Sequence, residues 1–209
     1  MTIKLRKGVL IVFEGTDGTG KSTQLQLLSR YLLGKGYPVL TTREPTEGQY
    51  GQQIRELYVN RSKYSQEQEL ELFLADRRQH VHDLLTPALE QGKVILCDRY
   101  FLSTAAYQGA RGFDPEDILK LNHFAPDPDL ALLFQVPLDT GLKRITSGRG
   151  EELHDFEQRE SLDQVAAIFS SIKRPYIRLI DSTGSIEEVH HTVIEHVRPL
   201  LSALLNDQV

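Results

Sequence analysis

The chain has 209 residues and a formal net charge of −5 at pH 7, with 24 basic against 29 acidic side chains. This length fits a single domain over 1–209 whose core needs no disulfide. The acidic balance argues against a general binder of nucleic acid or anionic membranes, whose surface is normally basic. The longest early apolar stretch, 9–13, is too short for a signal segment or a membrane span. The single cysteine, Cys97, excludes an internal disulfide, and we expect a cytoplasmic protein.

Apolar runs that end in turn residues recur along the chain and predict strands. They lie at 8–15, 37–45, 93–99, 129–137 and 176–184. Their apolar residues are continuous rather than alternating, as a parallel sheet covered on both faces requires.

Amphipathic stretches between these runs predict helices. A helical stripe follows the first strand and is closed by Gly34, and a final amphipathic helix begins near Ser185. The stretch 65–92 predicts a long helix that bends or breaks before Pro87. The alternation of strands and helices predicts the α/β class, a doubly wound five-stranded parallel sheet with helices on both faces.

A glycine-rich loop lies between the first strand and the first helix. Its sequence GTDGTGKS satisfies the pattern G-x-x-x-x-G-K-(S/T), in which backbone N–H groups and a helix N-terminus surround a phosphate. Lys21 is expected to reach the outer phosphates of ATP, and the Ser22 hydroxyl to ligate Mg²⁺. The alternative is an ordinary glycine-rich turn. The candidate ATP-binding residues are Gly15, Thr16, Asp17, Gly18, Thr19, Gly20, Lys21, Ser22 and Thr23.

Asp17 is unusual in a loop that binds anions, because its carboxylate repels phosphate. It has two interpretations. The side chain binds a sugar hydroxyl or a Mg²⁺-bound water on the acceptor side, or it is an exposed residue that caps the turn.

A second candidate phosphate site follows the third strand, in the segment LCDRYFLSTAAYQG. Asp98 stands at the carboxyl end of that strand, where ligands bind in open α/β sheets, and can hold Mg²⁺ through water. Arg99 offers a planar fork that matches phosphate oxygens. The alternative is a surface ion pair between these two neighbours.

Several segments together resemble the thymidylate (dTMP) kinases. Asp98-Arg99-Tyr100 followed by STAAYQG is similar to the DR(Y/H)xxSTxAYQG signature of that family, and Thr42-Arg43-Glu44-Pro45 is similar to its TREP segment. FEGTDGTGKST resembles its phosphate loop, and LFLADR its thymine-contacting helix. The order matches over nearly the whole chain. The resemblance implies the nucleoside monophosphate kinase fold, a homodimer, and transfer of phosphate from MgATP to dTMP.

The resemblance also implies roles for individual residues. Arg99 grips the acceptor phosphate with help from Arg43, and Phe73 stacks on the thymine ring while Arg77 donates to it. Tyr107 fills the space beside the 2′ carbon and disfavours a ribonucleotide. For Phe73 alone, a core position is the simpler interpretation. The full acceptor-site set is Asp17, Arg43, Pro45, Phe73, Arg77, Arg99, Thr104, Tyr107 and Gln108.

A mobile lid is expected at about 144–157, around the segment SGRG. Cations near the γ-phosphate lower the barrier to transfer, and a lid excludes water. Family members carry the catalytic basic residue either in the phosphate loop or in the lid. Because Gly18 occupies the loop position, Arg149 is the candidate that joins Lys21 and Arg99 as a catalytic residue. Arg144 and Ser182 are expected beside the ATP; a solvated surface arginine is the alternative for Arg149.

Some residues depart from the pattern or receive no functional role. Glu47 places a negative charge near the expected acceptor phosphate, where many bacterial members have GGT. His80 and His82 are interpreted as surface histidines, and the polar stretch that includes Glu69 as a solvated helix face.

Alternatives to a dTMP kinase are a deoxynucleoside kinase, another nucleoside monophosphate kinase, and a nucleotide-sensing protein without catalysis.

Overall fold

The computed structural model describes residues 3–60, 63–149 and 156–205, without the side chains of 146–160. In chain order its elements are β1 (Val9–Glu14), α1 (Lys21–Gly34), β2 (Val39–Arg43), α2 (Gln49–Val59), α3 (Gln66–His80), the π-helix η2 (Val81–Leu85), α4 (Thr86–Glu90), β3 (Val94–Asp98), α5 (Phe101–Gly109), α6 (Pro115–Leu121), β4 (Leu130–Gln135), α7 (Leu138–Arg149), α8 (Phe156–Ser171), β5 (Ile177–Asp181) and α9 (Ile186–Ser202). All five predicted strands are present.

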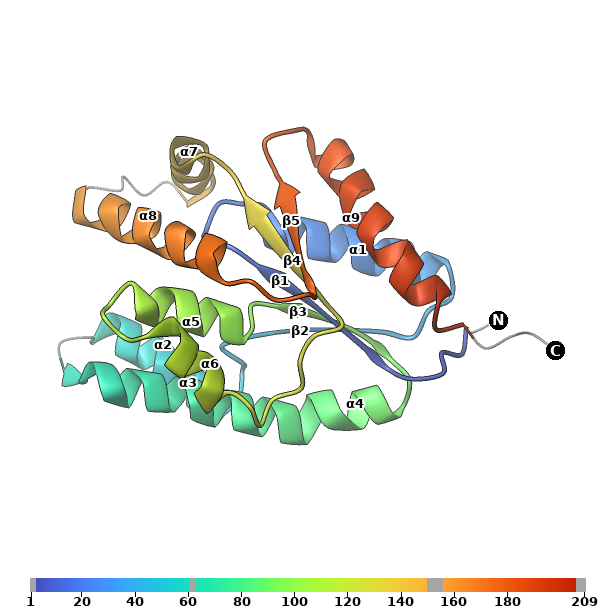
Figure 1. Cartoon of the computed structure of the whole chain (residues 1–209), viewed down its shortest axis with the longest axis horizontal. Coiled ribbons are helices and arrows are strands. Elements are labelled where there is room, and N and C mark those ends of the chain that lie inside the picture. The colour runs from blue at the N-terminus through green and yellow to red at the C-terminus, as the bar shows by residue number, and fades with distance from the viewer. Residues whose placement is uncertain (1–2, 61–62, 150–155, 206–209) are drawn as a thin grey trace.

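The strands form one parallel sheet in the order β2-β3-β1-β4-β5 (Figure 1). The chain therefore starts in the middle and moves outward on both sides, as in doubly wound folds. β1 is the central strand, and its carboxyl end lies between those of β3 and β4. The predicted fold class is confirmed.

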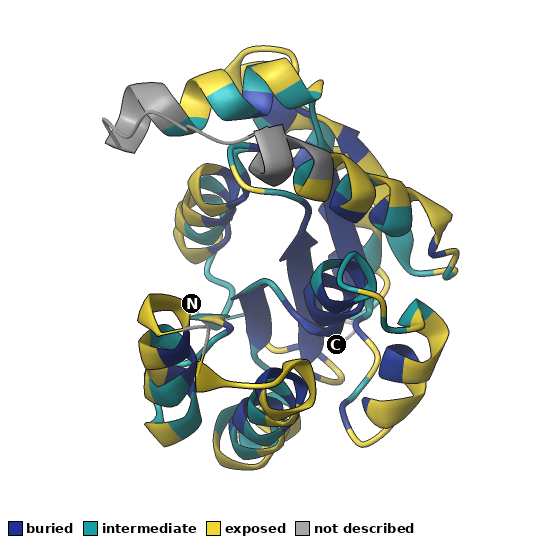
Figure 2. Cartoon of the chain, turned by 90° about the vertical axis from the view of Figure 1, so that its left-hand side faces the viewer, coloured by how far each residue is buried: buried dark blue, intermediate teal, exposed yellow. Residues whose placement is uncertain are grey.

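Helices cover both faces of the sheet, and the strands are its most deeply buried part (Figure 2). One apolar core joins α1 and α9 to alternate residues of the strands, for example Ile11 and Leu132. The other core joins α3, α4, α5 and α8 to the intervening residues, for example Val12 and Leu133. Two buried faces explain why the strand sequences are continuously apolar.

The long segment 65–92 is divided as the sequence predicts. α3 begins with a capping box, in which Ser65 and Gln68 satisfy each other's backbone N–H groups. The π-helix η2 follows, and α4 contains Pro87 near its start. Because proline cannot donate the i→i−4 bond, a break in the regular ladder before Pro87 is the expected result.

The helix α2 was not among the predicted elements. Its sequence, QYGQQIRELYV, is polar and contains Gly51, which weakens a helical pattern. The structure explains this glycine, because a Cβ at position 51 would lie 1.9 Å from the carbonyl oxygen of Thr46. The close contact with the loop after β2 therefore requires glycine at position 51, although glycine lowers the helix propensity of α2.

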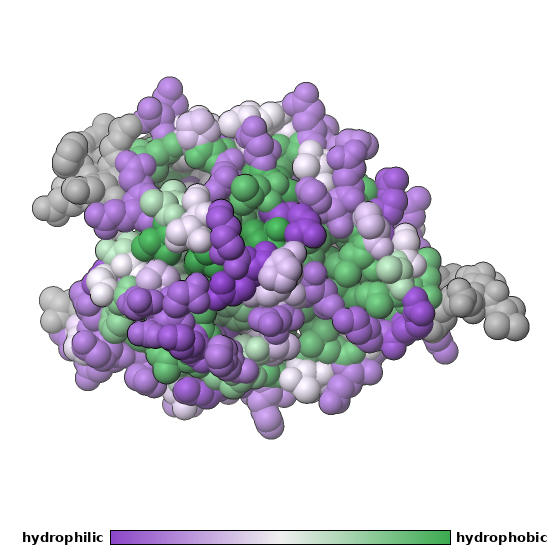
Figure 3. Space-filling view, viewed as in Figure 1, coloured by the Kyte–Doolittle hydropathy of each residue, from purple (hydrophilic) through white to green (hydrophobic). Residues whose placement is uncertain are grey.

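Among the described residues, every helix is too short or too polar to cross a membrane. Hydrophilic side chains cover most of the face seen in Figure 3, and apolar side chains reach the surface between α8 and the tips of β4 and β5.

We expect Gly51→Ala to lower the free energy of unfolding by about 1–3 kcal/mol, because the new methyl group overlaps the Thr46 carbonyl. Gly34→Ala is the matched control. No atom lies within 4 Å of a Cβ at that helical position, so alanine should be neutral or stabilising by up to about 1 kcal/mol. Urea unfolding of both variants measures the difference, and equal stabilities would contradict the packing argument.

Candidate active site

The carboxyl ends of three strands bring the predicted phosphate-binding segments together. Asp98 of β3 is in register with Phe13 of β1 on one side and with Arg43 of β2 on the other. The glycine-rich loop leaves β1 directly after Glu14. The loop, Asp98 and Arg43 therefore meet at one edge of the sheet, where ligands bind in folds of this kind.

The loop has the backbone of a phosphate-binding turn. Gly15, Gly18 and Gly20 have φ values of 129°, 77° and 88°, which side chains rarely allow. Lys21 begins α1, and its Nζ donates to the carbonyl oxygen of Thr16 at 2.7 Å. Burial, followed by the charge of Arg99, lowers the pKa of Lys21 to about 8. The lysine is thus held inside the loop, close to where a phosphate would bind.

The loop also contacts the first turn of α7. A Cβ at Gly18 would lie 2.3 Å from the carbonyl oxygen of Gly141. No larger residue fits at position 18 with α7 in this place, which gives a physical reason for the uncharged residue there.

The two candidate metal ligands are adjacent. Ser22 Oγ donates to Asp98 Oδ2 at 2.5 Å, at the mouth of the loop. A hydroxyl and a carboxylate are hard oxygen donors of the kind that Mg²⁺ prefers, usually together with waters and phosphates. The described residues contain no cluster of three or more His, Cys, Asp or Glu suited to a metal. The pair therefore suits an ion that is held mainly by nucleotide and water.

Arg99 lies against the phosphate loop. Its Nη2 donates to Asp17 Oδ1 at 2.8 Å and to the Tyr107 hydroxyl at 3.3 Å. Its Nη1 donates to the Gly15 carbonyl at 3.3 Å and to Ser103 Oγ at 3.1 Å. Arg99 has φ 68°, unusual for a non-glycine residue, and this turn directs the chain from β3 into α5. The structure therefore brings together Asp17, Arg99 and Tyr107, three residues expected at the acceptor site, around the Arg99 guanidinium.

Glu14, for which no role is predicted from the sequence, binds the turn that opens α5. Its side chain is fully buried. Oε1 accepts from the backbone N–H groups of Tyr100 at 2.9 Å and Ser103 at 3.3 Å, and Oε2 accepts from the Ser103 hydroxyl. Burial raises the pKa of Glu14 to about 7, although the Ser103 bonds and the Arg99 charge favour the ionised form. Glu14 thereby caps α5 and orients Ser103, which in turn contacts Arg99.

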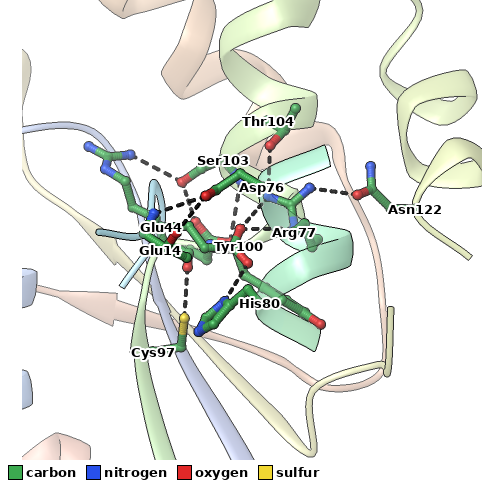
Figure 4. Close-up of polar contacts among 12 residues, drawn as sticks. Glu14, Glu44, Asp76, Arg77, His80, Cys97, Tyr100, Ser103, Thr104 and Asn122 are labelled. Carbon is green, nitrogen blue, oxygen red and sulfur yellow. Dashed lines mark hydrogen bonds and ion pairs between the residues drawn. The ribbon is translucent and has the colours of Figure 1, made fainter. Parts of the chain in front are cut away.

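Arg77 lies in a second buried polar cluster (Figure 4). It is 1% exposed, and its donors reach Glu44, Thr104 and Asn122. Arg77 and Thr104, each expected at the acceptor site, therefore lie 3.0 Å apart. His80 is also buried in this cluster, so its interpretation as a surface histidine was wrong. It packs inward because α3 turns this face toward Glu44 at the end of β2.

The loop after β2 is held by acidic residues. Asp76 accepts from the Thr46 backbone N–H at 2.9 Å and from its hydroxyl at 2.6 Å. Glu47 forms ion pairs with both Arg43 and Arg55. Its charge is thus balanced from two sides, and its pKa is lowered, chiefly by Arg43. An acceptor phosphate at Arg43 would compete with this exposed carboxylate.

The remaining residues expected at the acceptor site lie on α3, on α5 and in the loop after β2. Phe73 of α3 and Pro45 of that loop are half-buried, with surface left for a ligand. Gln108 Nε2 donates to Glu69 Oε1 at 3.0 Å, and the other Glu69 oxygen pairs with Arg111. Glu69 is 2% exposed, so its interpretation as part of a solvated face was wrong. The contacts with α5 draw it inward.

On the nucleotide side, Arg144 Nη2 donates to the carbonyl oxygen of Ser182 at 3.0 Å, so the two residues expected near ATP are adjacent. The side chain of Arg149 lies outside the described part of the chain, as do residues 150–155 of the expected lid at 144–157 and the other side chains of 146–157. A cavity of about 640 Å³ adjoins the loop at Gly15 and Thr16 and extends to Phe169 of α8. Phe169 also meets the Tyr107 ring edge-on, so this cavity lies beside the acceptor-site aromatic residue.

The polar residues that sequence reasoning missed share one property. They are buried. Glu44, Asn122, Glu69 and Ser103 bond directly to residues of the predicted set, whereas Glu14, Asp76 and His80 bond to neighbouring segments that hold those residues in place. FEG and TREP contain Glu14 and Glu44, but only their positions beside the predicted ligands could have indicated a role. The set is Glu14, Glu44, Glu69, Asp76, His80, Ser103 and Asn122.

Glu14 should make stability depend on pH. Between pH 4.5 and about 7 the folded protein retains a proton that the unfolded chain releases, so the free energy of unfolding falls as pH rises through this window. The loss should approach about 3 kcal/mol, at 1.36 kcal/mol for each pKa unit. Glu14→Gln should remove this component, as measured by urea unfolding at pH 5 and pH 8. Glu187→Gln on the exposed face of α9 is the control, and equal pH slopes for Glu14→Gln and the wild type would contradict the argument.

Comparison with known proteins agrees with this geometry. Residues 13–193 match the family model described as thymidylate kinase. The thymidylate kinase of Desulfotalea psychrophila is 58% identical over 194 residues, covering 93% of this chain and 96% of the relative. That of Akkermansia muciniphila is 46% identical over 88% of both chains, and a probable thymidylate kinase of Pyrococcus horikoshii is 40% identical over 95% of this chain and 100% of its own. A chain with this fold, these motifs at one sheet edge and these relatives belongs to the thymidylate kinase family.

Proposed function

We propose that this chain transfers the γ-phosphate of MgATP to dTMP, giving dTDP and ADP, through the residues at the carboxyl ends of β1 and β3. The contact between Arg99 and the glycine-rich loop carries this proposal. Nη2 of Arg99 is 2.8 Å from Asp17, and Nη1 is 3.3 Å from the Gly15 carbonyl. The cation suited to the acceptor phosphate thus lies against the loop suited to the donor. This proximity favours direct in-line attack by an acceptor oxygen.

On the donor side, the loop N–H groups and the start of α1 bind the β- and γ-phosphates, and Lys21 neutralises them. Ser22 would hold Mg²⁺ directly and Asp98 would hold it through water, as their 2.5 Å contact supports. When bound, the ion neutralises charge on the phosphates during transfer. Arg144 and Ser182 border the adenine.

On the acceptor side, Arg99 and Arg43 bind the dTMP phosphate, and Asp17 faces the 3′-hydroxyl or the metal's waters. Phe73 stacks on thymine beside Pro45, and Thr104 and Gln108 lie near the base and sugar. Arg77 donates to a base carbonyl. Tyr107 stands next to Arg99, whose guanidinium lies 5.1 Å from the ring centroid. This position suits the exclusion of a 2′-hydroxyl.

The transfer-assisting cation is Arg149, delivered by the lid at 144–157 in a single domain that spans 1–209. The contact between Gly18 and Gly141 supports this assignment, because it leaves no space for a charged side chain at position 18. α7 begins at this contact and ends at Arg149.

We also propose a homodimer in the cytoplasm. Exposed apolar side chains at the ends of α2 and α6 provide surface for a second copy of the chain. They are Tyr58, Val59, Leu121 and Phe124.

The reaction is tested by ADP release with dTMP, dUMP, dCMP, AMP and thymidine as acceptors. We expect dTMP to give the highest kcat/KM, and dUMP about 10–200-fold less, the discrimination that one methyl group in an apolar pocket supplies. Faster turnover of thymidine than of dTMP would identify a deoxynucleoside kinase instead. Tight ATP binding without transfer to any acceptor would identify a nucleotide sensor.

Arg149→Ala should lower kcat about 10²–10³-fold, because charge stabilisation in the transition state is lost, while the Kd for dTMP changes less than about twofold. Steady-state kinetics and calorimetric titration of dTMP measure the two quantities. Arg198→Ala makes the same change on the exposed face of α9 and should leave both unchanged. Unaltered turnover in Arg149→Ala would remove its catalytic role.

A further inference from the structure

Glu44 divides its two carboxylate oxygens between two partners. Oε2 accepts from Nε of Arg77 at 2.9 Å and also from its Nη2, whereas Oε1 lies 2.9 Å from Nδ1 of His80 (Figure 4). Glu44, Arg77 and His80 are 6%, 1% and 4% exposed, so these bonds lie inside the protein. Arg77 therefore binds one oxygen only, because His80 holds the other.

The surroundings of His80 specify its tautomer. An ionised carboxylate offers no proton, so Nδ1 of His80 must donate to Glu44. Nε2 then accepts from the Thr42 hydroxyl, 2.8 Å away. Both ring nitrogens thus have a partner, and the ring is held between β2 and the loop that carries Glu44.

The single-oxygen pairing determines how the Arg77 guanidinium is oriented. Its five N–H groups have a fixed planar arrangement. Two donate to Glu44, one on Nη2 donates to Thr104 at 3.0 Å, and one on Nη1 donates to Asn122 Oδ1 at 2.5 Å. Asn122 cannot turn this oxygen away without losing the bond from its Nδ2 to the Ile118 carbonyl, at 2.8 Å. Within the described part of the chain, one N–H of Nη1 has no acceptor.

We propose that His80, acting through Glu44, is a positioning residue that directs this remaining Arg77 N–H to a carbonyl of the pyrimidine. The inference rests on the proposed function, in which Arg77 faces the base. A donor held in one orientation favours a base with a carbonyl at that position over one with an amino group, because an amino group would leave two donors facing each other. Without His80, Oε1 of Glu44 would turn to Arg77 and draw the guanidinium into a two-oxygen pair, away from Thr104 and Asn122.

The test compares dTMP with dCMP, which carries an amino group in place of a carbonyl. His80→Phe keeps the ring volume and removes both nitrogens. We expect it to lower kcat/KM for dTMP about 10–100-fold, the usual cost of losing an orienting partner. The dTMP/dCMP ratio of kcat/KM should fall at least about tenfold, and KM for ATP should stay within about twofold. His80→Asn, whose amide nitrogen can occupy the Nδ1 position, should restore most of the ratio.

Further variants distinguish positioning from packing. Thr42→Val removes the hydroxyl donor to Nε2 and suits a strand, so it should lower the ratio in the same direction by a smaller factor and also serves if His80→Phe does not fold. His191→Phe makes the same chemical change at an exposed position, 72% exposed, and should change nothing. Reduced stability of His80→Phe with an unchanged dTMP/dCMP ratio would overturn the inference.

Arg77→Gln separates this inference from the proposal on which it rests. If Arg77→Gln abolishes discrimination while His80→Phe and Thr42→Val preserve it, Arg77 contacts the base and His80 is only a core residue. If Arg77→Gln itself preserves the ratio, the assignment of Arg77 to the base is wrong, and the inference about His80 falls with it. Phosphorylation of dTMP by the wild type would stand in either case.

Discussion

Buried carboxylates at the carboxyl ends of β1 and β2 determine how the site is assembled. A carboxylate without water is costly unless several donors converge on it. Glu14 obtains its donors from the turn that opens α5, and Glu44 obtains its donors from α3. Neither helix can shift along the sheet without breaking such bonds. Arg99 and Arg77, the residues proposed for the phosphate and the base, are therefore fixed to the ends of β1 and β2, which lie on either side of β3.

Each arginine expected at the acceptor site is already paired with an acid. Arg99 contacts Asp17, Arg43 contacts Glu47, and Arg77 contacts Glu44. The first two acids are more than half exposed, so water screens these pairs and an anionic ligand can compete with them. The third pair is buried. In the proposed function, phosphate recognition thus relies on partners that a ligand can displace, whereas base recognition relies on a buried ion pair.

The strands, the break before Pro87 and the residues around the glycine-rich loop could be predicted because they depend on local sequence. A continuous apolar run indicates a strand that is buried on both faces, and a turn glycine indicates a backbone conformation that other residues rarely adopt. The roles of Glu69 and His80 could not be predicted in this way. Both lie on a polar helix, and what makes them internal is the position of α5 and of the loop after β2. Helix α2 was missed for the same reason. Its Gly51 is explained by close contact with the Thr46 carbonyl, which lies in another segment.

The contact between the glycine-rich loop and α7 links the two halves of the proposed chemistry. A side chain at position 18 and α7 in its observed place exclude each other, because the Gly141 carbonyl occupies the space of a Cβ. A cation at position 18 would therefore require α7 to lie elsewhere. The same contact places the start of α7 at the edge of the loop, with Arg144 on this helix bound to the Ser182 carbonyl. Packing thus explains the uncharged residue at position 18, and α7 is the nearest element that could supply a cation in its place.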